Sequence, residues 1–299
     1  MNFQRDNFSD ADLSLLFEKL RSFVSLARTL NLSRTVKELG STRQTVRRHI
    51  SQLEEMKGKT LFQLNGRQYQ LTQAGQDALP EAADLLARGR SWLIGQVSHR
   101  NQLQYVKVNL PGDRIFVMQQ RPLGEIWTSE RPLLRTAFQA WSQARGELEA
   151  PEIKQVRPYF MVYRQTHVGW LCVEIGDDSS YVSWSGWATA RSSIGHHLTV
   201  LPGGDDIAHI MAGPFDDTAI QQHARLDHIY TQLAREPGGP YFFICYQRLL
   251  LGGRFPDGSL ALISIVDRHH DIEIDGLTPD DMRKMPDDCV MPAEIKLKI

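Results

Sequence analysis

Three helical patterns, separated by two brief interruptions, constrain the N-terminal part of this chain more than any other feature of the sequence. Apolar residues recur at spacings of three and four over residues 12–30, 33–39 and 42–56, which indicates amphipathic helices. Ser33 and Thr42 are suited to cap the second and third helices, and Gly40 is suited to end the second. Two short helices joined by a turn of about three residues form a helix-turn-helix.

The third predicted helix presents a row of polar residues that can bind DNA. With Val46, Ile50 and Leu53 pointing inward, its arginine and glutamine side chains are left outward. Arginine can form paired hydrogen bonds to guanine, and glutamine to adenine, when such a helix lies in the major groove. The alternative is the solvated basic face of an ordinary helix bundle. The predicted DNA-binding residues are Ser33, Arg34, Thr42, Arg43, Gln44, Thr45, Arg47, Arg48 and Arg67.

A hairpin is predicted directly after the third helix. Asn65-Gly66 lies between one apolar stretch at Leu61-Phe62 and another at residues 69–71, and Asn-Gly in this setting is a strong hairpin signal. A hairpin that follows a recognition helix is a wing. Arg67, near its tip, is placed to reach a phosphate or the minor groove.

The stretch from residue 23 to residue 75 resembles the winged helix-turn-helix domain of the LysR-type transcriptional regulators. It departs from the family pattern at Thr35 and Val36, where alanines are usual, at Arg47, where serine is usual, and at Leu64, where an arginine usually stands nearby. These departures leave the expected fold intact but alter the surface that would read a target sequence. The residues that carry the resemblance are Leu39, Val46, Ile50, Leu53-Glu54, Gly58, Leu61-Phe62, Arg67, Leu71-Thr72 and Ala74-Gly75.

The charge of the chain is distributed unevenly. Residues 1–100 contain 15 lysines and arginines against 10 acidic residues, whereas the remaining residues contain 19 against 25, so the net charge of −1 conceals a basic N-terminal part. That asymmetry favours a polyanionic partner, double-stranded DNA, for the first part alone. With no secretory signal, no membrane-length apolar run and three widely spaced cysteines, we expect a cytoplasmic protein without a membrane partner.

A long helix over residues 72–100 is predicted to link the two parts of the chain and to mediate homodimerisation. Leu79, Leu86 and Leu93 repeat every seven residues, Val97 lies on the adjoining row, and such a seam calls for a partner helix. Pro80 predicts a kink or a late start. The resemblance also implies a dimer, possibly a tetramer, through this helix. The alternative is packing of the seam onto the chain's own domains.

The remaining residues, 101–299, are predicted to form an α+β domain. Strands are expected over residues 156–163, 170–175 and 181–184, and a helix over residues 218–234. A closing hairpin is expected from residues 241–251 and 260–266 around a turn at Pro256-Asp257-Gly258. The chain as a whole is therefore expected to be a multidomain α+β protein, with a winged helix-turn-helix at 1–71, a linker helix at 72–100 and a sensor or effector domain at 101–299.

This order of elements resembles a PAS sensor domain, with a core at about residues 131–270. The segment GGRFPDGSLALISIVDR resembles its closing hairpin, and SSIGHHLTVLPGGDD resembles its middle part. The resemblance implies a small-molecule effector, a haem or flavin, or only a protein contact, so the cofactor is left unknown. Two alternatives stay open: the usual LysR-type effector domain, which resembles periplasmic binding proteins, and a domain that serves only oligomerisation.

No catalytic constellation, nucleotide-binding loop or metal-ligand spacing is evident, so we expect a regulator and not an enzyme. The histidine pairs at 196–197 and 269–270 each offer one ligand to a given face and are not predicted to bind metal. Ligand-binding residues are not assigned. Aromatic residues that either line a cavity or form core are Tyr163, Trp170, Trp184, Trp187 and Tyr246.

Overall fold

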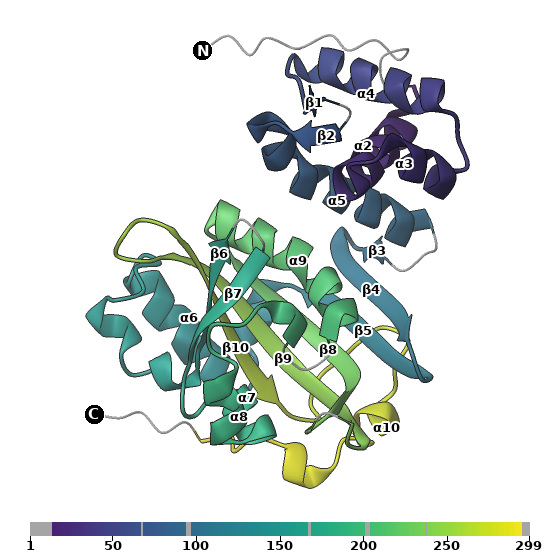
Figure 1. Ribbon diagram of the computed structural model, residues 1–299. Helices are drawn as coiled ribbons and strands as arrows, with labels where there is room; N and C mark the ends of the chain where they lie inside the picture. The colour runs from purple at the N-terminus through teal and green to yellow at the C-terminus, as the bar shows by residue number, and fades with distance from the viewer. Residues whose placement is uncertain are drawn as a thin grey trace. The chain divides into compact units, whose positions relative to one another are not determined.

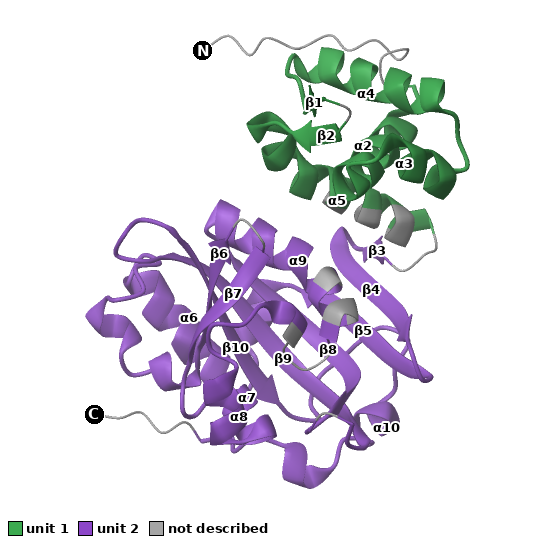
Figure 2. Ribbon diagram, in the orientation of Figure 1, with its two compact units in different colours: residues 1–95 green, residues 96–299 purple. Residues whose placement is uncertain are grey.

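The chain folds into two compact units, residues 1–95 and 96–299 (Figures 1 and 2). The computed structural model describes residues 14–66, 68–93, 97–166, 169–200, 204–236 and 238–294. Each unit is considered by itself below.

The first unit is a helix-turn-helix with a two-stranded wing. Its apolar core contains the inward residues of all four helices together with the first residues of the wing, and Val46 and Leu61 are fully buried. Phe62 packs edge-on against Phe23, so the wing is fastened to the first helix. The elements are α2 (Leu16–Thr29), α3 (Leu32–Leu39), α4 (Arg43–Lys57), β1 (Phe62–Asn65), β2 (Gln68–Leu71) and α5 (Gln73–Leu93).

The turn of the helix-turn-helix is held by side-chain caps. Thr42 caps α4 as predicted, its hydroxyl oxygen accepting from the Thr45 amide at 3.1 Å. The cap of α3 was wrongly predicted: Asn31, two residues earlier than Ser33, accepts from the amides of Ser33 and Arg34. The helix therefore begins at Leu32, because an asparagine in extended conformation ahead of an apolar residue is a better start than a serine inside the first turn.

The wing and the helix that follows it meet at a close backbone crossing. Glu54 accepts from the amides of Leu61 (2.7 Å) and Phe62 (3.1 Å), which ties the end of α4 to the start of the wing. Thr72 caps the first turn of α5 by accepting from the Gly75 amide at 3.0 Å. A Cβ on Gly75 would lie 2.2 Å from the Leu61 carbonyl oxygen, so only glycine fits there. The Leu-Thr-x-Ala-Gly segment, residues 71–75, is therefore needed for the wing to pack against α5.

The linker helix is shorter than predicted, and the three leucines of its predicted seam do not share one environment. α5 ends at Leu93, and Val97 lies in a strand, β3 (Val97–Arg100), so the prediction of a helical Val97 was wrong. A two-residue turn with positive φ angles at residues 101 and 102 returns β3 into the next strand, a geometry that hairpins favour. Leu79 and Leu86 pack against the core of the first unit, whereas Leu93 is 76% exposed.

The second unit is built on one eight-stranded sheet in which every neighbouring pair is antiparallel. The strand order is β3-β4-β5-β8-β9-β10-β6-β7 (Figure 1). The strands beyond β3 are β4 (Leu103–Leu110), β5 (Arg114–Arg121), β6 (Met161–Thr166), β7 (Gly169–Ile175), β8 (Ala224–Ala234), β9 (Tyr241–Arg254) and β10 (Leu260–Arg268).

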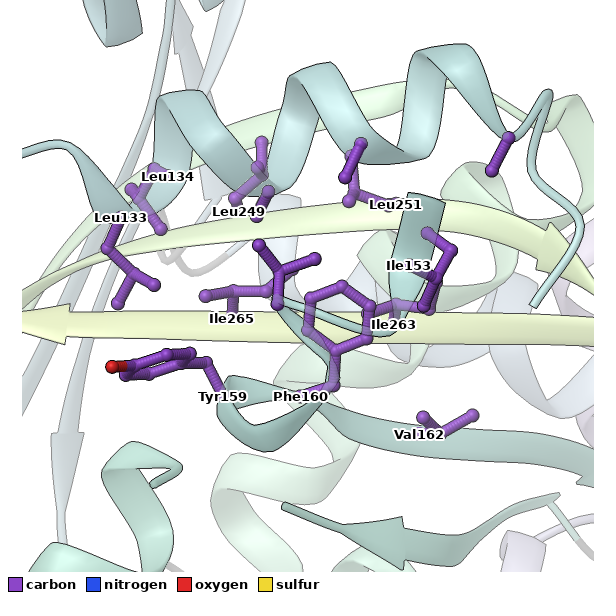
Figure 3. Packing of buried hydrophobic residues seen from close by; sticks show 14 of the residues in the cluster. Leu133, Leu134, Ile153, Tyr159, Phe160, Val162, Leu249, Leu251, Ile263 and Ile265 are labelled. Carbon is purple, nitrogen blue, oxygen red and sulfur yellow. The ribbon is translucent and has the colours of Figure 1, made fainter. Parts of the chain in front are cut away.

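Helices cover both faces of this sheet. Alternate residues of β10 belong to different cores: Ile263 and Ile265 face α6 (Leu133–Gln143), whereas Leu262 faces α9 (Gly204–Gln221). Figure 3 shows the first of these cores, with Leu133 and Leu134 directed from the helix toward the strands. The face that bears α9 also carries α7 (Ser180–Ser185) and α8 (Trp187–Ser192), and residues 272–290 cover the remainder of the α6 face around α10 (Pro279–Met282).

Three elements of this unit differ from the prediction. Residues 181–184 are helical in α7, because Ser179 caps a turn there. Residues 224–234, predicted to be helical, form β8, a central strand buried between β5 and β9; a strand buried on both faces has no alternating pattern to reveal it. The first strand begins at Met161, because residues 157–159 form a 3₁₀ turn. The closing hairpin of β9 and β10 is confirmed.

Candidate nucleic-acid interface

The second helix of the helix-turn-helix, α4, separates its buried and exposed residues cleanly. Val46, His49, Ile50 and Leu53 are buried and recur at helical spacing, which fixes the rotation of the helix about its axis. The outward face begins at the N-terminal cap and carries three arginines without an acidic residue until Glu54. Unpaired amides and the helix dipole make the N-terminal end of α4 favourable for phosphate.

The structure brings most of the predicted DNA-binding residues onto one surface formed by α3 and α4. Arg43 Nη2 donates to the Ser33 hydroxyl at 2.8 Å, and this hydrogen bond links α4 to α3 across the turn. Thr45 is half-buried and is held by the Thr42 cap. Arg67 lies outside the described residues. The exposed members of the set are Ser33, Arg34, Thr42, Arg43, Gln44, Arg47 and Arg48.

Two features of this surface were missed in the sequence. Asn31 is exposed beside Ser33 and Arg34 and orders the start of α3, and the signal for it was its cap-forming side chain before Leu32. Ser51 also lies on the exposed face of α4, next to Gln52, whose outward position was predicted from the helical spacing. Both lie at the spacing that the outward arginines already set.

A buried hydrogen bond anchors α4 to the first helix of the unit. The Ser22 hydroxyl and His49 Nδ1 are 2.9 Å apart, and both side chains are buried. Burial lowers the pKa of His49 below its usual value of 6.5, and the positive charge of Arg48 acts in the same direction. The neutral imidazole is therefore the form that fits beneath the recognition surface.

Because His49 is the one histidine among residues 1–95, the first unit should have a simple acid response. An unfolded His49 takes up a proton as the pH falls below about 6.5, and the folded one resists it, so stability is full above pH 6.5 and declines below it. Hydrogen exchange of α2 and α4 in the intact chain should show a smaller opening free energy at pH 5.5 than at pH 7.5. Replacing His49 by glutamine should remove that difference; an unchanged pH response in this variant would assign it to other groups.

Among the described residues, no helix combines the length and the apolar character that a membrane span requires. The same residues contain no group of three or more histidine, cysteine or acidic side chains arranged to hold a metal ion.

Comparison with known proteins bears on the first unit. Residues 17–76 match the family model of the bacterial regulatory helix-turn-helix protein, lysR family. Residues 17–76 are therefore similar to the helix-turn-helix domain of that family. This chain is also similar to the HTH-type transcriptional regulator CitR of Bacillus subtilis (strain 168), with 41% identity over 70 residues. That similarity covers 23% of this chain and 24% of CitR, so it spans about a quarter of the curated relative.

Two solved structures are similar to about a quarter of this chain. The oxidized form of Corynebacterium glutamicum OxyR is 25% identical, with 26% of each chain covered and a TM-score of 0.26. The crystal structure of the CbnR_DBD-DNA complex is 29% identical, covers 26% of this chain and 92% of that one, and has a TM-score of 0.25. The match to the lysR-family model lies within the first of the two units.

Proposed function

We propose that this protein is a homodimeric, sequence-specific transcription regulator that binds double-stranded DNA through α4 in the major groove. The observation that carries the proposal is the exposed basic face of α4 on a domain that matches the lysR-family helix-turn-helix. The relative CitR is itself a transcriptional regulator. Such a protein acts in the cytoplasm as a regulator and not as an enzyme.

The geometry suggests separate roles for the residues of the surface. Arg43, Gln44 and Arg47 lie in the first turns of α4, where a recognition helix contacts base edges. Arg34, Arg48 and the hydroxyls of Ser33 and Thr42 lie around them and are assigned to phosphates, which position the helix without reading sequence. We assign Arg67 of the wing to the neighbouring phosphate or minor groove.

We propose that the dimer forms through an apolar surface on α5 and α2, here called the α5 patch, that replaces the predicted leucine seam. Gly89 lies in van der Waals contact with Phe17, since a Cβ on it would be 2.4 Å from the ring. Large apolar side chains with half or more of their surface exposed surround this contact, and a second copy would cover them. The α5 patch consists of Phe17, Leu85, Gly89, Trp92 and Leu93.

We further propose that the second unit is a PAS-like sensor. Five strands, β6 to β10, lie in the order β7-β6-β10-β9-β8, with α7, α8 and α9 inserted after the second of them. The resemblance of this strand order to that of a PAS domain supports the proposal, and the antiparallel pairing argues against a doubly wound domain, which requires parallel strands. A cavity lined in part by Tyr163, Trp184 and Tyr246, three of the five aromatic residues predicted as candidates, favours sensing over oligomerisation alone.

Selection from a random duplex library, followed by mobility shift at increasing salt, tests the function. We expect a pseudo-palindromic site and affinity that falls with salt, because each phosphate contact releases counterions and contributes about 0.9 to the logarithmic slope. Arg48→Ala should reduce the slope by about one for each bound subunit without altering the selected sequence. Recovery of no consensus, or binding indifferent to salt, would contradict the proposal.

A further inference from the structure

The second unit contains a partly open cavity of about 150 Å³ between its sheet and the helices of the α9 face. The floor is formed by alternate residues of β6, β9 and β10, and the roof by α7 and α9, including Ala208 and Met211. An apolar cavity of this size holds a molecule about as large as benzene. The buried part of the space is therefore suited to a single ring or a short branched chain.

Two arginines make the floor unusual, because both are buried and both line the cavity. Arg268 is 5% exposed, and within the described part of the chain it donates only to neutral oxygens: the Cys289 carbonyl (2.9 Å), the backbone and side chain of Ser180, and the Ser183 hydroxyl (2.8 Å). Burial lowers its pKa to about 10, so these partners do not fully offset the hydration that the guanidinium loses. Asp267, the residue before Arg268, points to the other face of the sheet and pairs with Arg131.

Arg248, also 5% exposed, is only partly compensated. Its Nη2 donates to Asp227 Oδ2 at 2.7 Å, but Asp227 also accepts from Arg225 at 2.8 Å, so one carboxylate serves two guanidinium groups. The remaining acceptors are the sulfur atoms of Met118 and Met211, which are weak. Among the described residues, Arg248 Nε has no hydrogen-bond partner at all.

The register of the strands places these two arginines on the same face of the sheet, as diagonal neighbours on β9 and β10. Val266 of β10 lies directly opposite Arg248 of β9, and Arg268 is two residues further along the same face. Such diagonal neighbours are within reach of one another's long side chains. Among the described residues, Asp227 is the carboxylate that pairs with Arg225 and Arg248, so this buried wall carries more positive than negative charge. A buried charge without a counter-charge is costly, and a bound anion would lower that cost.

We infer that this cavity binds a small organic acid whose carboxylate is held between Arg248 and Arg268 and whose ring-sized apolar body fills the space beneath α9. The inference rests on the proposed sensor function and specifies its ligand class. A guanidinium has five N–H donors, so Arg268 keeps one Nη2 donor and Arg248 keeps one Nη1 donor beyond the hydrogen bonds given above, and each can bind one oxygen of a carboxylate. The aromatic and aliphatic lining, including Phe215 and Ile244, suits the body of the ligand.

The test compares benzoate with benzamide, its neutral isostere, by calorimetric titration of the full chain. We expect benzoate to bind with a Kd of about 1 mM or tighter, and at least about tenfold more tightly than benzamide, because only the anion gains charge-assisted hydrogen bonds. Arg268→Gln should reduce that preference to about twofold, and Ala208→Leu, which fills the cavity without touching an arginine, should weaken both probes.

The comparison of the two probes on the unaltered chain does not depend on the folding of either variant. Equal affinity for benzoate and benzamide, or no binding of benzoate, would overturn the inference. A mobility shift in the absence of probe keeps this outcome separate from the proposed function: DNA binding that persists when the probes fail would reject only the acid site, whereas loss of DNA binding would reject the regulator.

Discussion

Replacing Asp227 by asparagine should destabilise the second unit by about 3–5 kcal/mol, because it leaves two buried guanidinium groups without their shared carboxylate. Asp227 is fully buried and accepts hydrogen bonds from Arg225 and Arg248. Burial alone would raise its pKa, but the two positive charges outweigh that effect and hold the pKa below its usual value. A loss of this size is a large share of the total stability of an ordinary domain.

Tryptophan fluorescence during denaturant unfolding measures this effect, because five of the six tryptophans lie in residues 96–299. The matched control is Asp177→Asn, which breaks an ion pair to Arg191 whose side chains are about half exposed. That surface pair should contribute about 1 kcal/mol or less. If both variants unfold at the same denaturant concentration, the Asp227 cluster does not stabilise the sheet as described.

Leu86→Asp and Trp92→Asp place a charge on the same helix but should affect different properties: the first the stability of the unit, the second its dimerisation. Leu86 packs on the core of the first unit, so aspartate there should cost about 2–3 kcal/mol of that unit's stability through lost burial alone. Trp92 is 72% exposed in the α5 patch, so aspartate there should leave the unit folded and should separate the proposed dimer.

Sedimentation measures the dimer, and hydrogen exchange in α2 and α4 measures the fold of the unit. Leu64→Asp, which alters an exposed leucine of the wing outside the α5 patch, is the control and should remain dimeric. Dissociation by Leu86→Asp in a fully protected first unit would restore the leucine seam as the interface. A dimer that survives Trp92→Asp would assign self-association to the second unit.

The helix-turn-helix was predictable because its signals are local. Thr42, Gly40 and the Asn65-Gly66 turn each act on the few residues around them, and the structure shows the cap, the positive φ of the glycine and the paired wing strands. The orientation of α4 followed from Val46, Ile50 and Leu53 at helical spacing. The candidate DNA-binding surface was therefore accessible from sequence, apart from the shift of the α3 cap to Asn31.

The second unit was less predictable because its determinants are distant in the sequence. The apolar residues of 224–234 satisfy a helical spacing, and only the pairing with β5 and β9, which buries both faces, makes the segment a strand. The heptad of Leu79 and Leu86 likewise fits a dimer seam, yet both pack on α2 and its neighbours. The cavity arginines, Arg248 and Arg268, come together only through the register of β9 and β10.

Base preference is the most direct test that α4 reads DNA. Duplex selection with Gln44→Ala and Arg43→Ala should relax the preference at particular positions of each half-site, by about 1–3 kcal/mol per lost paired contact. Arg21→Ala, which removes the same charge from α2, is the matched control and should select the original sequence. The account predicts position-specific relaxation in the α4 variants alone; if they select the wild-type consensus and merely bind it more weakly, α4 is not the helix that reads the sequence.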